Sequence, residues 1–309
     1  MTKGRDITNL PASVHDRLLT LARAQGIQYQ EALQYFAMER FLYRLSRSTH
    51  ARSFVLKGAL MLRVWQIPQS RLTRDIDLLG FTDNSTDNLA AVVRDVCLTP
   101  VLDDGLTFEV ETVNAQPIRE RADYEGVRVT FVAHLGKSVL PMQIDIGFAD
   151  AITPAPEVID YPVLLDFPAP RLRAYPRETT VAEKFQAMVE LGENNSRMKD
   201  FYDLWQMSRL FEFDGKVLCA AIRATFHRRG TTFGNETPVA LTDAFGANGS
   251  KLTQWRAFLR KSRLQDAEGG WAEVIASLRE WLLPIVTALQ QNAQLERKWQ
   301  PTRGWRSLT

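Results

Sequence analysis

The first fifty residues contain two runs in which hydrophobic positions recur every three or four residues. One run is PASVHDRLLTLARA, residues 11–24, and the other covers residues 29–46. This spacing places the hydrophobic side chains on one face of a helix, and Gly26 between the runs is the residue type that most often ends one. We predict two helices joined at Gly26, within an N-terminal segment, residues 1–50, that packs on the core.

The next part of the chain changes to short hydrophobic runs and to the two-residue alternation of β-strands. Residues 54–65, FVLKGALMLRVW, predict a short strand that leads through Gly58 to a helix, and RLTRDIDLLGF, residues 71–81, predicts a buried strand. A helix is expected at residues 85–98. Three further runs are expected to be antiparallel neighbours of the buried strand: LTFEVETV (106–113), GVRVTFVAHL (126–135) and VLPMQIDIGF (139–148).

The last half of the chain is mostly helical in pattern. Prolines are dense between residues 154 and 176, which is typical of a connector, and the pattern beyond residue 178 is helical apart from a loop at 230–250. We predict an α/β chain of the α+β kind. A sheet domain with a mixed or antiparallel sheet, residues 51–176, is followed by a helical C-terminal domain, residues 177–309.

The composition is that of an ordinary globular protein, since 45% of its 309 residues are hydrophobic. The sequence has no hydrophobic run of about 18 residues, and MTKGRDITNL at its start lacks the hydrophobic stretch of a secretion signal. We therefore expect a cytoplasmic protein that does not associate with a membrane. The two cysteines, Cys97 and Cys219, are expected to be buried thiols and not a disulfide or zinc site.

Charge is distributed unevenly along the chain. Residues 1–170 contain 17 Lys and Arg against 21 Asp and Glu, whereas the remainder contains 21 against 15. A basic C-terminal half together with an acidic site would suit an enzyme that acts on a polyanion. Solvated helix surfaces would give the same asymmetry.

Asp75 and Asp77 lie two positions apart in the predicted buried strand, so their side chains point to one side and Ile76 points to the other. Two ionised carboxylates in a half-buried position require compensating charge, which a divalent cation supplies. We therefore predict a metal site at this pair. The alternative is an exposed strand end with two solvated acids, against which the continuing hydrophobic run argues.

Asp145 lies in QIDIGF, a run that repeats the form of the first strand with a single acid. If this run pairs beside the strand of Asp75 and Asp77, the three carboxylates could hold two divalent ions. The alternative is that Asp145 is an acid satisfied by backbone donors.

RETTVAEKFQAMVELG predicts a helix that starts at Thr180, because Thr180 and Glu183 have the spacing of a capping box. Lys184 would then lie in the first turn, close to the hydrophobic face. A cation opposes the helix dipole there, which suggests an anionic ligand nearby. Alternatively, the stem of Lys184 covers apolar surface while its amine reaches water.

SRMKDFYDLW, residues 196–205, predicts a second helix with Asp200 and Asp203 on one face. Asp200 could orient Lys184 or contact the reacting hydroxyl. Asp203 could equally be a partner of Lys199 or an inter-helix cap.

Basic and small residues precede the carboxylate pair. Arg71, Thr73 and Arg74 lie at the entrance of its strand, where a guanidinium could bind phosphate oxygens. Lys57 and Gly58 lie earlier in the chain, and a glycine permits close approach of the backbone to phosphate.

Four motifs in a fixed order, KGALML, RLTRDIDL, VAEKFQA and RMKDFYDL, resemble those of the AbiEii/AbiGii toxin family of nucleotidyltransferases, which includes the mycobacterial MenT toxins. They extend from Lys57 to Leu204, about half of the chain. One departure is Gly58-Ala59, where the family usually has two adjacent small residues, Gly-Gly or Gly-Ser.

The resemblance implies a DNA-polymerase-β-like nucleotidyltransferase fold and a set of site residues. Asp75 and Asp77, with Asp145, would be the metal ligands for Mg²⁺ or for Mn²⁺ in its place. Lys184 would contact the nucleotide phosphates, and Asp200 would be an essential acid. The catalytic set is thus Asp75, Asp77, Lys184 and Asp200, and the nucleotide-binding set is Lys57, Gly58, Arg71, Thr73 and Lys184.

The resemblance also implies the toxin of a toxin–antitoxin pair. Such a toxin would transfer a nucleotide, typically a pyrimidine one, from an NTP to the 3′ end of tRNA, and would so block aminoacylation and translation. Its partners would be the NTP, the tRNA acceptor and a cognate antitoxin encoded nearby, and the protein is expected to be a monomer.

Residues 216–309 contain 14 Lys and Arg against 7 acids, together with five tryptophans. Arg256, Arg260, Lys261 and Arg263 are spaced to share part of one helical surface, which would suit an RNA acceptor. Most of the tryptophans are expected in the core, and ERKWQPTRGWRSLT at the end is expected to be a flexible basic tail.

Two other functions are compatible with parts of the sequence. The same fold could transfer a nucleotide to a protein hydroxyl or to a small molecule. A non-enzymatic nucleic-acid-binding module, with the first two helices near a helix-turn-helix, would leave Asp75, Asp77 and Lys184 unexplained.

Overall fold

The computed structural model describes residues 9–68, 73–121, 124–264 and 270–307, and it divides the chain into two compact units. The sheet unit consists of Met1–Val64, Leu72–Ala149 and Glu157–Ala174. The helical unit consists of Trp65–Arg71, Asp150–Pro156 and Tyr175–Thr309. The chain therefore passes from one unit to the other several times, and Asp150–Pro156 belongs to the helical unit although both of its neighbouring stretches belong to the sheet unit.

The sheet unit is built on a seven-stranded mixed sheet in the order β3-β4-β5-β2-β1-β7-β6. The strands are β1 (Phe54–Lys57), β2 (Asp75–Gly80), β3 (Leu106–Arg121), β4 (Tyr124–Leu135), β5 (Ser138–Phe148), β6 (Glu157–Asp160) and β7 (Arg171–Ala174). Two of the pairings, β2 with β5 and β1 with β7, are parallel, and the others are antiparallel. The predicted mixed sheet is therefore confirmed.

The helices of this unit begin and end near the predicted positions. They are α1 (Leu10–Gln25), α2 (Tyr29–Arg47), α3 (Leu60–Val64) and α4 (Thr86–Cys97). Gly26 ends α1 with a φ of 67°, as the glycine between the two hydrophobic runs predicted, and β1 leads through Gly58 to α3. The expected helix at 85–98 is α4, whose N-cap Ser85 accepts a hydrogen bond from the Asn88 N–H.

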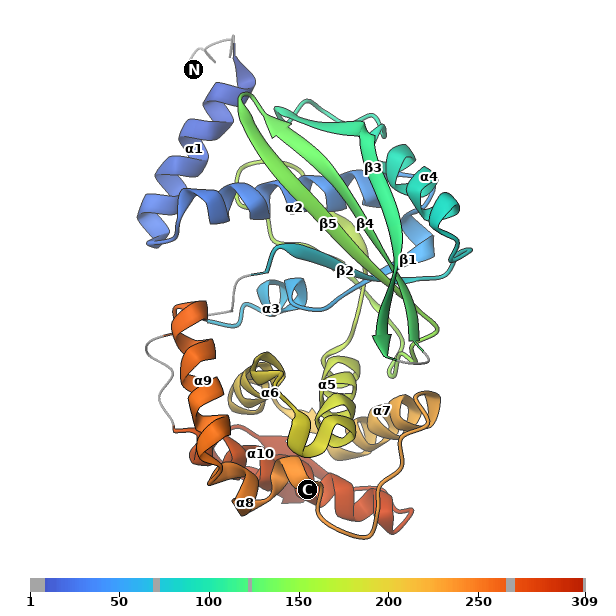
Figure 1. Ribbon diagram of the computed structural model, residues 1–309, viewed down its shortest axis with the longest axis vertical. Helices are drawn as coiled ribbons and strands as arrows, with labels where there is room; N and C mark the ends of the chain where they lie inside the picture. Colours follow the sequence, from blue (N-terminus) through green and yellow to red (C-terminus); the bar gives the residue numbers. More distant parts are fainter. Residues whose placement is uncertain (1–8, 69–72, 122–123, 265–269, 308–309) are drawn as a thin grey trace. The chain divides into compact units, whose positions relative to one another are not determined.

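Helix α2 crosses one face of the sheet (Figure 1). Its buried Gln34 donates to the Pro141 carbonyl of β5 at 3.2 Å, and the β5 residues on that side, Ile144 and Ile146, are fully buried. Burial of these alternate residues is the main source of packing free energy on this face. An internal ion pair, Arg44 Nη1 with Asp104 Oδ2 at 2.6 Å, links α2 to the chain just before β3.

The helical unit contains α5 (Arg177–Leu191), α6 (Met198–Leu210), α7 (Gly215–Arg228), α8 (Asp243–Gly246), α9 (Gly249–Ser262) and α10 (Trp271–Gln290), with a small antiparallel sheet of β8 (Phe213–Asp214), β9 (Arg297–Gln300) and β10 (Gly304–Ser307). Its core is rich in aromatic side chains. The rings of Trp255 and Trp271 pack at a tilt with 5.5 Å between their centroids, and Phe201 meets Trp271 edge to face at 5.0 Å. Most of the tryptophans are thus buried, as predicted.

Two expectations about strands are wrong. Strand β5 is the neighbour of β2 but runs parallel to it. Strands β4 and β3 are not neighbours of β2, because β5 separates β4 from it and β3 lies beyond β4 at the edge of the sheet. The expectation of a flexible basic tail is also wrong for the described residues up to Ser307, because β9 and β10 form a hairpin there. Trp299 of that hairpin is buried and donates to the Ser208 carbonyl at 2.7 Å. Burial of the indole ring fixes a segment whose charge alone had suggested mobility.

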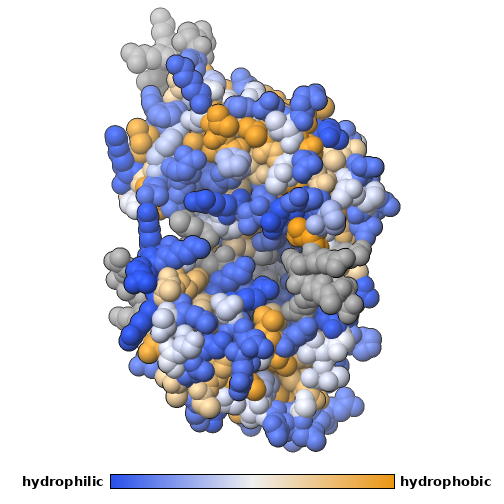
Figure 2. Space-filling model, viewed as in Figure 1, coloured by the Kyte–Doolittle hydropathy of each residue, from blue (hydrophilic) through white to orange (hydrophobic). Residues whose placement is uncertain are grey.

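Among the helices of the described residues, none combines the length and the hydrophobic character needed to cross a membrane. On the face drawn in Figure 2, hydrophilic residues cover most of the surface and the hydrophobic ones form small groups between them. The large hydrophobic side chains lie mainly in the core.

Candidate active site

The predicted carboxylates lie in a row of charged residues that crosses the middle of the sheet. Asp77 of β2 is paired in register with Lys57 of β1 on one side and with Asp145 of β5 on the other. Asp145 is in turn paired with Arg128 of β4. Residues paired across neighbouring strands point to the same face, so two carboxylates lie between two cations on one face of the sheet.

This face is opposite to the one that packs on α2. Ile76 and Ile144 are paired and fully buried on the α2 side, whereas Asp75 and Asp77 alternate with Ile76 and therefore point to the other side. Asp75 is paired with Gln143 of β5. Asp75, Asp77 and Asp145 are all half-buried, so the exposed strand end considered above does not describe these residues.

Gly58 lies directly against Asp77. Its φ is +72°, a backbone conformation that glycine adopts readily, and a Cβ atom added at this position would lie 1.9 Å from Oδ2 of Asp77. No real Cβ could occupy that place. The glycine of KGALML therefore makes room for a carboxylate, a role that differs from the close approach to phosphate predicted from the sequence.

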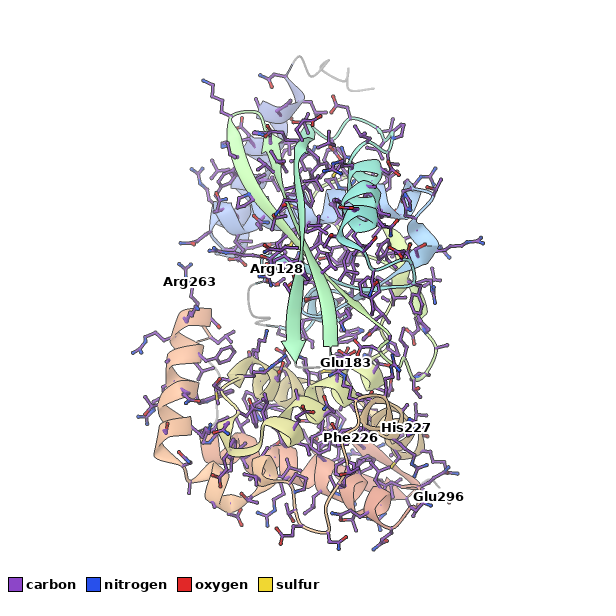
Figure 3. All side chains as sticks on the ribbon, turned by 45° about the vertical axis from the view of Figure 1, so that its right-hand side comes forward. Arg128, Glu183, Phe226, His227, Arg263 and Glu296 are labelled. Atoms are coloured by element: carbon purple, nitrogen blue, oxygen red, sulfur yellow. The ribbon has the colours of Figure 1, made fainter. Side chains whose placement is uncertain are left out.

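Arg128 donates hydrogen bonds to both carboxylate oxygens of Asp145. Nε donates to Oδ1 at 2.8 Å and Nη2 donates to Oδ2 at 2.7 Å, and the Gln143 amide lies 3.3 Å from both oxygens. Arg128 projects from β4 (Figure 3). The hydrogen bonds to Asp145 raise the pKa of Arg128, and the charges of Asp75 and Asp77 act in the same direction. The alternative in which Asp145 is satisfied by backbone donors is thus replaced by a side-chain ion pair.

Asp75 and Asp77 have the donor chemistry that Mg²⁺ prefers. Their carboxylates lie on one face of a single strand, and hard divalent cations favour oxygen ligands of this kind. Among the described residues, no group of three or more His, Cys, Asp or Glu side chains is placed to hold a metal ion. The Asp145 oxygens bind Arg128, and a metal site at these carboxylates stays a prediction.

Thr73 and Arg74 come directly before β2. The N–H of Thr73 donates to the Tyr35 hydroxyl at 3.3 Å, and the Thr73 hydroxyl lies 3.4 Å from the backbone of Asp75. Arg74 follows directly, while Arg71 lies outside the described residues. Lys57, the last residue of β1, is brought to Asp77 by strand pairing.

Lys184 and Asp200 form a second polar cluster, within the helical unit. The Lys184 ammonium lies 2.8 Å from Asp200 Oδ1 and 2.7 Å from Asp203 Oδ2, and Arg197 Nε lies 2.6 Å from Asp200 Oδ2. The side chains of Asp200 and Asp203 are 1% and 0% exposed, and that of Lys184 is 13% exposed. Burial by itself would raise the pKa of Asp200, but the charges of Lys184 and Arg197 outweigh it and hold that pKa well below its usual range.

Asp203, expected to be a partner of Lys199 or an inter-helix cap, is a partner of Lys184. It binds the same ammonium as Asp200, one turn further along α6. The spacing of three residues in RMKDFYDL was the available signal, because residues three apart share a helix face.

The prediction that α5 starts at Thr180 is wrong. The helix begins at Arg177 after Pro176, and Lys184 lies about two turns inside it. The two residues of the capping-box pattern do not cap the helix, and Glu183 lies 3.5 Å from Arg229 Nη2 instead. Glu183 accepts a hydrogen bond from the Tyr175 hydroxyl at 3.0 Å, and Thr180 is buried in the helix. The argument from the dipole of the first turn therefore does not apply to Lys184, whose neighbours are the two buried carboxylates.

Arg128 was not among the predicted site residues. In GVRVTF it is a polar residue of an alternating strand, which is common on any exposed face. Arg128 is indicated as a site residue only by its register with Asp145, which is paired in turn with Asp77. Strand register between distant segments is not visible in a single sequence.

The fold resembles that of two solved proteins. The nucleotidyltransferase toxin MenT4, Rv2826c, from Mycobacterium tuberculosis H37Rv matches with a TM-score of 0.50 and 18% identity, over 90% of this chain and 98% of the MenT4 chain. A candidate nucleotidyltransferase from H. pylori matches with a TM-score of 0.50 and 14% identity, over 86% of this chain and 99% of its own. The chain therefore has the predicted nucleotidyltransferase fold. A search of the curated proteins finds no relative.

The family follows from the sequence itself. The model of the family described as nucleotidyl transferase AbiEii toxin, type IV toxin–antitoxin system, matches residues 40–282. This match spans most of the chain, and the chain belongs to that family of nucleotidyltransferase toxins. The resemblance carried by the four short motifs is thereby confirmed, and the family implies an NTP substrate and an antitoxin partner.

Proposed function

We propose that the protein transfers a nucleotide from an NTP, preferably a pyrimidine NTP, to the 3′ end of tRNA, and so blocks aminoacylation and translation. The observation that carries this proposal is the pair Asp75 and Asp77 on one sheet face, with Gly58 against Asp77, in a chain of the nucleotidyltransferase toxin family. In the proposed reaction the 3′-hydroxyl of the RNA attacks the α-phosphorus of the NTP. A phosphodiester bond forms, the bond to the bridging oxygen breaks, and pyrophosphate leaves as the hydroxyl loses its proton.

Asp75 and Asp77 would hold the divalent ion, for which Mg²⁺ is the expected species. A bound Mg²⁺ would supply Lewis-acid stabilisation of the negative charge that develops on the phosphates. Both carboxylates are half-buried, and carboxylate oxygens are the ligands that a hard divalent cation prefers.

Cationic and polar groups would position the triphosphate. Lys57 lies at the end of β1 in register with Asp77, and the backbone of Thr73 is fixed by Tyr35. Lys184 is proposed to contact a phosphate through an ammonium that Asp200 and Asp203 orient. Their role is one of orientation, because two buried carboxylates restrict the position of the flexible lysine side chain.

The surface of α9 supports an RNA acceptor. Arg256, Arg260, Lys261 and the C-cap residue Arg263 are all exposed, and α9 contains no acidic residue. Arg263 extends from the end of the helix (Figure 3). Such a run of exposed guanidinium and ammonium groups, which we call the α9 basic surface, suits the closely spaced phosphates of RNA. The protein is proposed to act as a monomer on this substrate.

The test uses purified protein, total tRNA, Mg²⁺ and each of the four α-labelled NTPs in separate reactions. Asp75→Asn is the inactive variant, and Glu111→Gln, an exposed acid of β3, is its matched control. Label on tRNA with a pyrimidine NTP, in the control but not in Asp75→Asn, is the expected result. Resistance of the labelled tRNA to aminoacylation would then establish the block.

Other outcomes would overturn parts of the proposal. Label on a protein or a small molecule in place of tRNA would move the acceptor to a different class while retaining nucleotidyl transfer. Binding of nucleic acid without transfer of any label would favour a binding module. Equal activity in Asp75→Asn would exclude the proposed role of the β2 carboxylates.

A further inference from the structure

The pairing of Arg128 with Asp145 changes what Asp145 can do. A side-on pair uses Nε and Nη2 of the guanidinium and both oxygens of the carboxylate. A metal ion would have to compete for the same oxygens, against two short charge-assisted hydrogen bonds. Asp145 therefore already has the cation that a half-buried carboxylate requires.

The same pairing directs one end of the guanidinium outward. Because Nε and Nη2 face Asp145, the covalent geometry of arginine places Nη1 on the far side of the group. The Arg128 side chain is 35% exposed, compared with 13% for Asp145. The carboxylate is thus the more deeply placed partner, and the guanidinium lies between it and solvent.

The position in the sheet places this cation close to the carboxylate pair. Arg128 and Asp77 are the two register partners that flank Asp145. The next pair along these strands, Val127 with Ile146, points to the α2 side. The fields of Asp75 and Asp77 reach Arg128. A nucleoside triphosphate bound over Asp75 and Asp77 would bring several negative charges to this face, and a planar guanidinium with paired donors suits phosphate oxygens better than an ammonium does.

We propose that Arg128, held by Asp145, contacts the phosphates of the nucleotide beside Asp75 and Asp77, and that Asp145 is a positioning residue and not a metal ligand. This inference rests on the proposed binding of the nucleotide at Asp75 and Asp77. It adds Arg128 to the nucleotide-binding residues and reduces the carboxylates available to the metal to the two on β2.

The experiment combines two binding measurements on four proteins: the wild type, Arg128→Ala, Asp145→Asn and the double variant. The first measurement is the Kd of an α,β-methylene NTP in the presence of Mg²⁺, and the second is the Kd of Mn²⁺ alone, followed by electron paramagnetic resonance. Lys137→Ala is the matched control, because it removes one exposed cation from the turn between β4 and β5. Circular dichroism and thermal unfolding check that each variant is folded.

Arg128→Ala is expected to weaken nucleotide binding by about 10- to 100-fold, the usual range for a lost charge-assisted contact, with no such loss in Lys137→Ala. Asp145→Asn should weaken nucleotide binding in the wild-type background and have no further effect in Arg128→Ala. Such non-additivity is the sign of one residue acting through another. Mn²⁺ binding by Asp145→Asn should stay within about twofold of the wild type, since the ion binds the β2 pair.

Two results would overturn the inference. If Asp145→Asn weakens Mn²⁺ binding by about tenfold or more in both backgrounds, Asp145 is a metal ligand. If Arg128→Ala binds the nucleotide as the wild type does, the ion pair has only a structural role. Where the Arg128 results are as expected but no tRNA is labelled, the acceptor assignment fails while the inference stands. A wild-type protein that binds none of the nucleotides would overturn both.

Discussion

Gly58 and Asp77 are in such close contact that no side chain could fit between them. The Asp77 carboxylate lies where the Cβ of any other residue at position 58 would have to be, and the φ of Gly58 is +72°. The position of a proposed metal ligand thus depends on the absence of a side chain at the residue that follows β1.

Gly58→Ala is therefore expected to lower nucleotidyl transfer by about 100-fold, because the new methyl group must push the Asp77 carboxylate out of place and such displacements have effects of this size. Steady-state transfer assays and Mn²⁺ titration would measure the loss. Gly26→Ala is the matched control, since Gly26 has a similar φ of +67° with no atom within 4 Å of an added Cβ. It should lose about 1 kcal/mol of stability from the left-handed conformation and retain activity. Equal activity of the two variants would contradict the steric explanation.

Lys184→Met should destabilise the protein by about 3 to 5 kcal/mol, because it leaves Asp200 and Asp203 as buried carboxylates without their shared cation. Urea unfolding followed by fluorescence would measure the change. Lys216→Met is the control, since Lys216 forms an exposed pair with Glu296 and its removal should have little effect. If both variants lose the same small amount, the cluster is not the buried network that the structure describes.

The pKa of Asp200 predicts how stability depends on acid pH. Because the folded-state pKa lies below the unfolded value, the unfolded chain binds more protons as the pH falls below about 4, and stability is lost in that range. Thermal unfolding between pH 6 and pH 3 should therefore show a steeper loss for the wild type than for Asp200→Asn. Parallel curves for the two proteins would argue against a strongly lowered pKa.

Glu39 predicts an opposite trend near neutral pH. Burial raises the pKa of Glu39 from 4.5 to about 7, and the charge of the adjacent Arg40 offsets this only in part. The folded protein then holds a proton that the unfolded chain has lost, so the free energy of unfolding falls as the pH rises from about 5 to about 7, by up to about 3 kcal/mol.

Urea unfolding at pH 5 and pH 8 would test this trend. The loss between the two pH values should be smaller in Glu39→Gln than in the wild type, whatever the absolute stability of that variant. Glu111→Gln, which changes an exposed acid, should keep the wild-type difference. A Glu39→Gln variant with the same pH dependence as the wild type would show that Glu39 titrates normally.

The α9 basic surface predicts the salt dependence of RNA binding. Neutralising Arg256 and Arg260 together should weaken tRNA binding and should lower the slope of log Kd against log salt concentration by about one to two, because fewer counterions are released. Filter binding at several salt concentrations would measure it. The control is Arg23→Gln with Lys137→Gln, which removes the same charge from exposed positions of the sheet unit. If the two double variants have equal slopes, the salt dependence reflects only the net charge of the protein, and the α9 basic surface is not the RNA-binding surface.

Much of the local structure could be predicted from the sequence because it depends on nearby residues. Gly26 marked the end of α1, the run at 54–65 predicted β1 and α3 with Gly58 between them, and the alternating runs predicted β4 and β5. Each of these signals lies within a few residues of the feature that it predicts.

The remaining features depend on which distant segments meet. The alternation in QIDIGF does not say that β5 runs parallel to β2, nor that Arg128 lies beside Asp145. Thr180 and Glu183 match a capping box, but tertiary contacts and Pro176 set the start of α5. The terminal hairpin is held by the buried Trp299, and the charged residues around Trp299 in the sequence had predicted an exposed tail instead.

The short stretch Asp150–Pro156 contacts the rest of the helical unit through its two polar residues, Asp150 and Thr153. Arg229 Nη2 lies 2.9 Å from the buried Asp150 carboxylate, and the Thr179 hydroxyl exchanges hydrogen bonds with the backbone of Thr153. These contacts join segments on either side of β6 and β7, which belong to the sheet unit. No single cut in the gene separates the two units, so the protein cannot be treated as two modules. Truncation after β7 would remove Arg229 and leave the buried Asp150 carboxylate without this partner. Neither unit is one continuous segment, so neither can be exchanged between relatives by replacing a single stretch of sequence.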